Sequence, residues 1–154
     1  MARPPKPTVT IASLQKDLRV PRKRIEELVR FVARRRKIAL ADVDVAVVDG
    51  RRMSRLNRRW LGRSGTTDVI SFDLTGDADR GITAQIIVCA TVARREAERR
   101  GIGPQRELLL YVLHGLLHVA GLDDRTPTQR KRMEACQVSL LAAFVAGESS
   151  AARR

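Results

Sequence analysis

Two histidines and an aspartate in the C-terminal part of the chain have the residue types and spacing of metal ligands. His114 and His118, the two histidines of the sequence, are four residues apart in an apolar segment, and Asp124 follows six residues later. Four residues make about one turn of an α-helix, so both imidazoles project from the same helix face. Two imidazoles and a carboxylate would leave an open coordination position, which is typical of catalytic zinc.

The turn after this helix offers two aspartates as the third ligand. Gly121 ends a helix readily, because glycine adopts the left-handed conformation easily, and it lets the chain turn back. Asp123 or Asp124 then reaches a metal held by the two imidazoles. The alternative is that both histidines are core residues bonded to backbone carbonyls. We favour the metal site, because an apolar helix gains nothing from two adjacent imidazoles that each become charged near neutral pH.

The residue at position 115 bears on the class of reaction. Helical zinc peptidases carry a glutamate directly after the first histidine, and this glutamate is their general base. This chain has Gly115 instead, which has no side chain to take up a proton. A peptidase is therefore disfavoured, although the helical arrangement of the two histidines is similar to that of the zincins.

The charge of the chain favours a polyanionic partner. Thirty lysines and arginines against seventeen acids give a formal net charge of +13, and residues 51–63 hold six arginines and no acid. Arginine matches phosphate oxygens in geometry and charge. Because the chain has only one Trp, one Tyr and three Phe, we expect salt-sensitive backbone contacts rather than an aromatic platform. The alternative is a solvated surface, which would mix the charge signs more evenly. The candidate RNA-binding residues are Arg55, Arg58, Arg59 and Arg63.

Length and composition are those of one domain. A chain of 154 residues that is 44% hydrophobic suits a single core, and no apolar run reaches the roughly 18 residues that span a bilayer. We expect a domain over residues 8–146 between disordered tails at 1–7 and 147–154, with no membrane association and no small organic cofactor. The start of the chain lacks the apolar stretch of a secretory signal. Cys89 and Cys136 have no CxxC spacing, so we expect buried thiols and a cytoplasmic protein.

Strand-like and helix-like segments interleave, which predicts a mixed α/β domain of the α+β type with one roughly four-stranded mixed sheet and about five helices. The first strand is expected at an edge of the sheet. In the second helix, Met53, Leu56, Trp60 and Leu61 form the expected buried stripe. Thr-Pro-Thr-Gln at 126–129 predicts a capping box before the last helix. The expected strands cover residues 8–12, 42–49, 66–74 and 83–90, and the expected helices cover 22–37, 51–63, 92–101, 105–120 and 127–146.

These motifs resemble those of the YbeY family, the single-domain bacterial metal-dependent endoribonucleases of ribosomal RNA maturation. The family pattern HGxLHLxGYDH is followed closely from His114 to Asp124. The family's leucine–asparagine helix and PTDVLSF strand match residues 56–57 and 67–72. The order of elements agrees over roughly residues 8–145, which is nearly the whole chain.

The resemblance implies a function and a set of ligands. It implies a single-strand-directed endoribonuclease with a zincin-like metal helix, which acts on ribosomal RNA or a ribosomal subunit. One Zn²⁺ per chain would be held by His114, His118 and Asp124, and would activate the water that attacks a phosphodiester. Asp123 is then the acceptor of a hydrogen bond from a ligand, or the ligand itself if the register is shifted.

Three positions depart from the family pattern. Asp124 replaces the third histidine of the family, and a carboxylate oxygen also binds zinc. Leu61 stands where the family has an arginine, with Arg59 or Arg63 as candidate substitutes, and residues 84–85 read Ala-Gln in place of a glycine–acid pair. Two other functions therefore stay open. The first is an RNA- or ribosome-binding module with a structural metal or none. The second is a zinc hydrolase that acts on proteins or small molecules, which would not need the arginine-rich helix.

Overall fold

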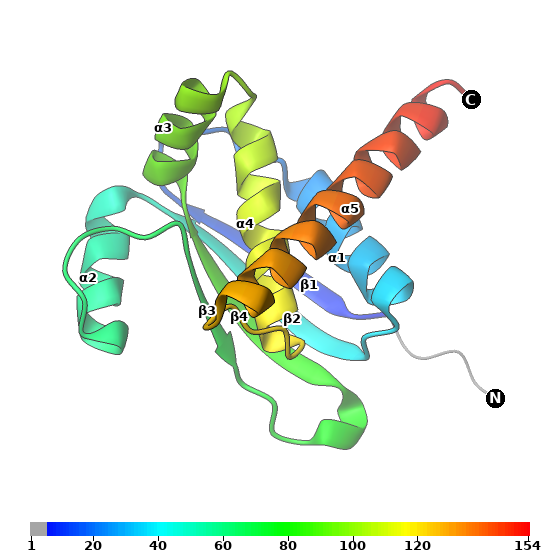
Figure 1. The fold of residues 1–154 in the computed structure, drawn as a ribbon, viewed down its shortest axis with the longest axis horizontal. Helices are drawn as coiled ribbons and strands as arrows, with labels where there is room; N and C mark the ends of the chain where they lie inside the picture. The colour runs from blue at the N-terminus through cyan, green and yellow to red at the C-terminus, as the bar shows by residue number, and fades with distance from the viewer. Residues whose placement is uncertain (1–5) are drawn as a thin grey trace.

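The computed structural model describes residues 6–154 and contains the four strands and five α-helices that the sequence predicts (Figure 1). A short 3₁₀ helix, η1, lies in the predicted turn between the last two strands. Of the predicted N-terminal tail, residues 1–5 lie outside the described residues, and residues 6–7 have no regular structure. The elements are β1 (Thr8–Leu14), α1 (Arg22–Arg36), β2 (Leu40–Val48), α2 (Gly50–Leu61), β3 (Val69–Asp73), η1 (Ala78–Arg80), β4 (Ile82–Cys89), α3 (Ala90–Arg100), α4 (Pro104–Val119) and α5 (Pro127–Ala152).

The strands form one mixed sheet in the order β1-β2-β4-β3. β1, β2 and β4 are parallel, and β3 runs antiparallel to β4 at one edge. β1 lies at the other edge, as predicted. The alternation along β2 defines the two faces of the sheet, since Val43, Val45 and Val47 are buried whereas Asp42 and Asp44 are exposed. One face of the sheet therefore carries the core, and the acids of β2 lie on the other.

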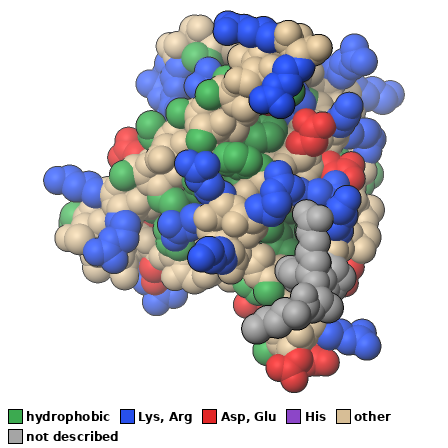
Figure 2. Space-filling model, turned by 90° about the vertical axis from the view of Figure 1, so that its right-hand side faces the viewer, with side chains coloured by type: hydrophobic (Ala, Val, Ile, Leu, Met, Phe, Trp, Pro, Cys, Tyr) green, Lys and Arg blue, Asp and Glu red, His purple; other side chains and the backbone are tan. Residues whose placement is uncertain are grey.

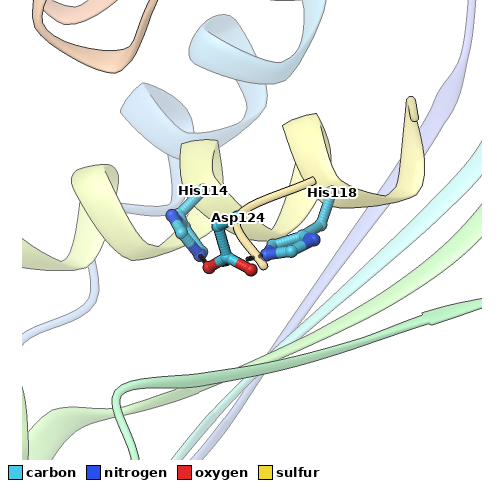
Figure 3. A group of neighbouring side chains, drawn as sticks. All are labelled: His114, His118 and Asp124. Carbon is cyan, nitrogen blue, oxygen red and sulfur yellow. Dashed lines mark ion pairs between the residues drawn. The ribbon is translucent and has the colours of Figure 1, made fainter. Parts of the chain in front are cut away.

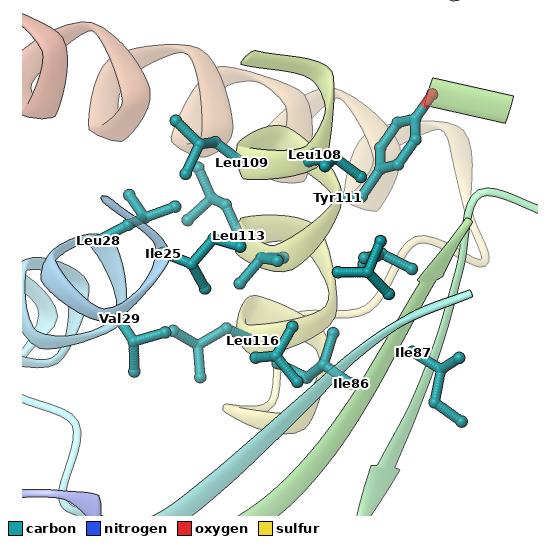
Figure 4. Close-up of a cluster of buried hydrophobic side chains, with 14 of the residues drawn as sticks. Ile25, Leu28, Val29, Ile86, Ile87, Leu108, Leu109, Tyr111, Leu113 and Leu116 are labelled. Carbon is teal, nitrogen blue, oxygen red and sulfur yellow. The ribbon is translucent and has the colours of Figure 1, made fainter. Parts of the chain in front are cut away.

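The central element of the core is α4, which packs against α1, α3, α5 and the strands β3 and β4. This position explains why α4 is apolar nearly all round. Figure 4 shows Ile25, Leu28 and Val29 of α1 beside Leu113 of α4, with Ile86 of β4 on the sheet side. Full burial of each such side chain contributes about 1.5–3 kcal/mol. The helix that carries both histidines is thus held in the core by elements on several sides.

The second helix differs most from its prediction. Met53 is fully buried and Leu56 partly so, but Trp60 is 57% exposed and Leu61 47% exposed, so the predicted stripe is wrong at its C-terminal end. Asn57 is buried instead, and its side-chain amide donates a hydrogen bond of 3.0 Å to a carbonyl of the following loop. The physical reason is that α2 lies at the side of the domain (Figure 1), where its neighbours cover only a narrow strip of its surface.

The last helix is longer than predicted. The prediction of a disordered tail from residue 147 is wrong as far as Ala152, because α5 continues through Gly147. A glycine inside a helix costs only about 1 kcal/mol relative to alanine and does not end it by itself. Arg24 of α1 also anchors the extension, since its guanidinium donates two hydrogen bonds, of 2.8 and 2.9 Å, to the carboxylate of Glu148.

The start of α5 has the predicted capping box. The backbone N–H of Gln129 donates to the Thr126 hydroxyl at 3.1 Å, and the Thr126 N–H donates to the Gln129 side chain at 3.0 Å. Among residues 6–154, α5 is the one helix with the length and composition of a membrane span. Helices that pack on folded domains meet the same criterion, so this is weak support for a span. Four of its residues are buried in the domain: Met133, Leu140, Leu141 and Phe144.

Candidate metal centre

The C-terminal end of α4 reverses the chain and brings an aspartate back to the two histidines. Gly121 has a φ of 108°, a value that L side chains rarely adopt. Its N–H donates to the carbonyl of His118, and the N–H of Leu122 donates to the carbonyl of Leu117, both at 3.0 Å. This pair of bonds is a Schellman motif, which ends the helix at the predicted glycine. Asp124 comes next along the reversed chain.

The side chains of His114, His118 and Asp124 point toward one another (Figure 3). Oδ2 of Asp124 lies 3.3 Å from Nε2 of His118 and 3.7 Å from Nε2 of His114. The candidate ligand atoms of all three residues lie within 4.8 Å of one another. The three side chains, called the donor group below, are 27–38% exposed. Solvent and substrate can therefore reach them.

The spacing from the Asp124 carboxylate to each histidine is close to that of neighbouring ligands of a small tetrahedral cation. Zinc–ligand distances of about 2.0–2.2 Å place tetrahedral ligand atoms roughly 3.3–3.6 Å apart. The two nitrogen–oxygen distances, 3.3 and 3.7 Å, are close to this range. Two imidazole nitrogens and one carboxylate oxygen are also a suitable set of zinc ligands, and a fourth position is left open.

The surroundings of His114 favour its neutral form. Burial lowers the pKa of His114, and the nearby imidazole of His118 lowers it further, while the charges of Asp68 and Asp124 act in the opposite direction. The net shift of the pKa is downward from its ordinary value. Because a metal binds the neutral imidazole, His114 is a competent ligand at neutral pH without first losing a proton.

Gln137 of α5 is a neighbour of the donor group that the sequence did not single out. Its side-chain amide contacts Nδ1 of His114. If Nε2 of His114 binds a cation, Nδ1 carries a proton, and the amide oxygen of Gln137 is the acceptor for it in one of the two amide orientations. The signal in the sequence was a polar residue on the otherwise apolar face of the last helix.

Asp123 lies outside the donor group. Its Oδ1 accepts a hydrogen bond of 2.9 Å from the backbone N–H of Asp124, and its Oδ2 lies 3.3 Å from Nε of Arg125. Asp123 therefore stabilises the turn and pairs with an exposed arginine. Of the two candidate aspartates, the structure brings Asp124 to the histidines and holds Asp123 at the turn.

Glycine at position 115 is explained by the packing of α4 on the sheet. A Cβ atom at Gly115 would lie 2.8 Å from Cγ2 of Ile86 and 3.2 Å from Cγ2 of Val69. The first of these distances is too short for any real side chain unless the Ile86 side chain or β4 shifts. The glutamate of a zinc peptidase therefore has no room at this position. Peptidase chemistry is thus disfavoured by packing as well as by the missing general base.

The predicted RNA-binding arginines lie on and after α2. Arg55, Arg58 and Arg59 line a surface hollow of about 380 Å³ together with Arg51, and Arg63 is exposed in the following loop. None of the donor-group residues lines this hollow. The structure thus gathers three of the four predicted arginines in one place, separate from the candidate metal centre.

The register of β3 shows on which side of the sheet each group lies. Ser71 pairs with Ile86, which faces α4, so the next residue, Phe72, points to the opposite face. There the ring of Phe72 meets the ring of Trp60 of α2, with centroids 5.7 Å apart. The edge strand β3 therefore lies between the side of the sheet that carries Trp60 and the side that faces α4.

Fold and site together define a class of protein. A small α/β domain, whose central helix and the turn after it bring together three accessible residues that could hold a metal ion, has the arrangement of a hydrolase. The model of the family described as endoribonuclease YbeY matches residues 10–145, and the chain belongs to this family.

Comparison with individual proteins confirms the assignment. The chain is 33% identical over 131 residues to an endoribonuclease YbeY of Nocardioides sp., with 79% of this chain and 88% of the relative covered. It is 32% identical over 159 residues to an endoribonuclease YbeY of Acidothermus cellulolyticus, with 95% and 96% covered. A solution structure of a Thermotoga maritima protein superimposes with a TM-score of 0.64 at 25% identity and covers 93% of each chain.

Proposed function

We propose that this protein is a zinc-dependent endoribonuclease that cleaves single-stranded ribosomal RNA during ribosome biogenesis in the cytoplasm. The observation that carries the proposal is the convergence of His114, His118 and Asp124 in a member of the YbeY family. Both curated relatives described above are named endoribonucleases. The free thiols of Cys89 and Cys136 are compatible with a reducing compartment.

Each residue of the donor group has its own role in metal binding. His114 and His118 offer neutral nitrogen ligands, and Asp124 offers an oxygen whose negative charge offsets part of the charge of a dication. Zn²⁺ held there would supply a Lewis acid that lowers the pKa of water and polarises a phosphoryl oxygen. Gly121 holds Asp124 in place through the turn, and Gln137 orients the ring of His114.

The arginines of α2 support a phosphodiester substrate. Within the described residues 6–154, no arginine of α2 forms an ion pair, whereas four arginines of α3 pair with nearby glutamates. Guanidinium groups without acidic partners keep their full attraction for phosphate. Figure 2 shows that basic side chains also outnumber acidic ones on the face that carries α1 and the end of α5.

Charge reversal on α2 is expected to weaken RNA binding. In the variant Arg55→Glu/Arg58→Glu/Arg59→Glu, loss of three phosphate contacts should reduce the slope of log affinity against log salt by roughly 2. Fluorescence anisotropy of a labelled single-stranded RNA in EDTA measures this slope. The matched control is Arg94→Glu/Arg95→Glu/Arg99→Glu on α3, which changes the net charge equally at arginines that already have acidic partners. Equal losses in both variants would show that only net charge matters.

A non-catalytic RNA-binding module is the second candidate, because Leu61, 47% exposed, stands where the family has an arginine. Chelation separates the two functions. The proposed enzyme loses RNA cleavage in EDTA and regains it with added Zn²⁺, whereas a binding module never cleaves and keeps its salt-dependent affinity. Cleavage that continues unchanged in excess EDTA would refute the metal-dependent mechanism.

Gln137 is expected to support metal binding through His114. Gln137→Ala removes the partner of Nδ1, and loss of such a neighbour typically weakens metal affinity by about 10- to 100-fold. Competition with a zinc chelator measures the dissociation constant directly. The matched control is Glu134→Ala, one turn earlier on α5 and exposed, which should leave zinc affinity unchanged. Zinc affinity in Gln137→Ala equal to that of the unmodified protein would contradict the orienting role.

A further inference from the structure

The tryptophan of this chain lies on the surface beside the arginines of α2. Trp60 is 57% exposed, although burial of so large an aromatic side chain would stabilise the fold. Its ring makes an edge contact with Phe72, at 5.7 Å between centroids and an interplanar angle of 72°. The guanidinium of Arg59 lies 5.4 Å from the ring centroid, within the range of a cation–π interaction. The indole therefore contacts Phe72 and Arg59 while much of it stays accessible.

Two features of this surface are complementary to an unpaired nucleotide. An accessible indole offers a flat apolar face, on which any of the bases can stack. The adjoining hollow, lined by Arg51, Arg55, Arg58 and Arg59, offers guanidinium groups to the neighbouring phosphates. Arg59 belongs to both features, and a guanidinium can also stack on a base from the other side.

The position of the Trp60 ring relative to the sheet is compatible with an RNA strand that passes over the free edge of β3. Phe72 belongs to β3, which pairs only with β4 and has a free outer edge among the described residues. Trp60 lies on the side of β3 that is turned away from α4, as the register shows. A single strand of RNA held on α2 could pass over this edge toward the donor group. A base that is paired and stacked in a duplex has no free face for the indole, so the site favours unpaired RNA.

We propose that Trp60, supported by Phe72 and flanked by Arg59, is a stacking site for one unpaired base of an RNA strand whose phosphates contact the α2 arginines. This inference rests on the proposed RNA-directed function. It adds one stacking contact to the expectation, drawn from the small number of aromatic residues, that RNA binding relies mainly on backbone contacts.

The single tryptophan makes the site directly observable. The full-length protein is titrated in EDTA with a fluorescein-labelled oligoadenylate of about 12 nucleotides, a length that spans one single-strand site. Anisotropy gives the affinity, and the fluorescence of Trp60 in an unlabelled titration reports stacking. We expect quenching at saturation with oligoadenylate, and none with an abasic strand of equal length. Trp60→Leu should weaken oligoadenylate binding by roughly 5- to 150-fold, the loss typical of one stacked base.

Two further variants complete the test. Trp60→Phe, which keeps an aromatic face, should recover most of the affinity, and Val138→Ala, at an apolar position 64% exposed on α5, should match the unmodified protein. Oligoadenylate binding by Trp60→Leu with unchanged affinity, or saturation without quenching, would overturn the stacking site while leaving the RNA-directed function intact. Absence of any RNA binding by the unmodified protein would overturn both.

Discussion

His118→Ala is expected to lower the rate of RNA cleavage by about a thousandfold or more. The reason is that a metal contributes several kcal/mol to stabilisation of the transition state, and each 1.4 kcal/mol corresponds to about tenfold in rate. With His118 removed, one nitrogen and one carboxylate oxygen would remain, which is too few for a stable zinc site. Cleavage of a single-stranded RNA under single-turnover conditions measures the effect, and circular dichroism verifies that the variant is folded.

Asp123→Ala is the matched control for this variant. Asp123 accepts a bond from the Asp124 backbone and pairs with Arg125, so it acts only through the position of its neighbour. Its replacement should cost no more than about tenfold in rate. If Asp123→Ala lost as much activity as His118→Ala, the shifted register, with Asp123 as the ligand, would be correct.

Gly115→Glu is expected to lower the free energy of unfolding by at least about 3 kcal/mol, since overpacking and a buried carboxylate act together. The first added atom would already lie 2.8 Å from Ile86. The substitution recreates the peptidase motif in sequence, but it should yield an unstable protein instead of a peptidase. Urea unfolding followed by circular dichroism measures the change.

A second glycine in a helix serves as the control. A Cβ atom added at Gly147 of α5 would meet nothing within 4 Å, so Gly147→Glu should leave stability unchanged or raise it by up to about 1 kcal/mol through helix propensity. A Gly115→Glu variant as stable as Gly147→Glu would show that the Ile86 and Val69 side chains can give way at no cost. The explanation that packing against Ile86 requires glycine at position 115 would then be wrong.

The predictable parts of the structure are those with strong local signals. A strand was predicted at residues 42–49, where the structure has β2, and the capping box predicted the start of α5. The spacing of the histidines and Gly121 predicted a helix that ends in a turn carrying an aspartate. Each of these signals acts between residues close in sequence, so the sequence alone sufficed.

The parts that were missed depend on contacts between distant segments. Trp60 and Leu61 were expected to be buried as part of the apolar stripe, but which side of α2 is covered depends on where α3 and β4 lie. The helix beyond Gly147 is held partly by Arg24, more than 100 residues away in sequence. Gln137 reaches His114 only because α5 crosses α4 at that turn. No local pattern encodes such contacts.

The metal content of the purified protein tests the central claim most directly. Elemental analysis is carried out on the unmodified protein and on His118→Ala and Asp124→Ala, each loaded with zinc and freed of excess by gel filtration. The donor group predicts close to one zinc per chain in the unmodified protein and little in either variant. Near-stoichiometric zinc in all three proteins would contradict the assignment of His118 and Asp124 as ligands.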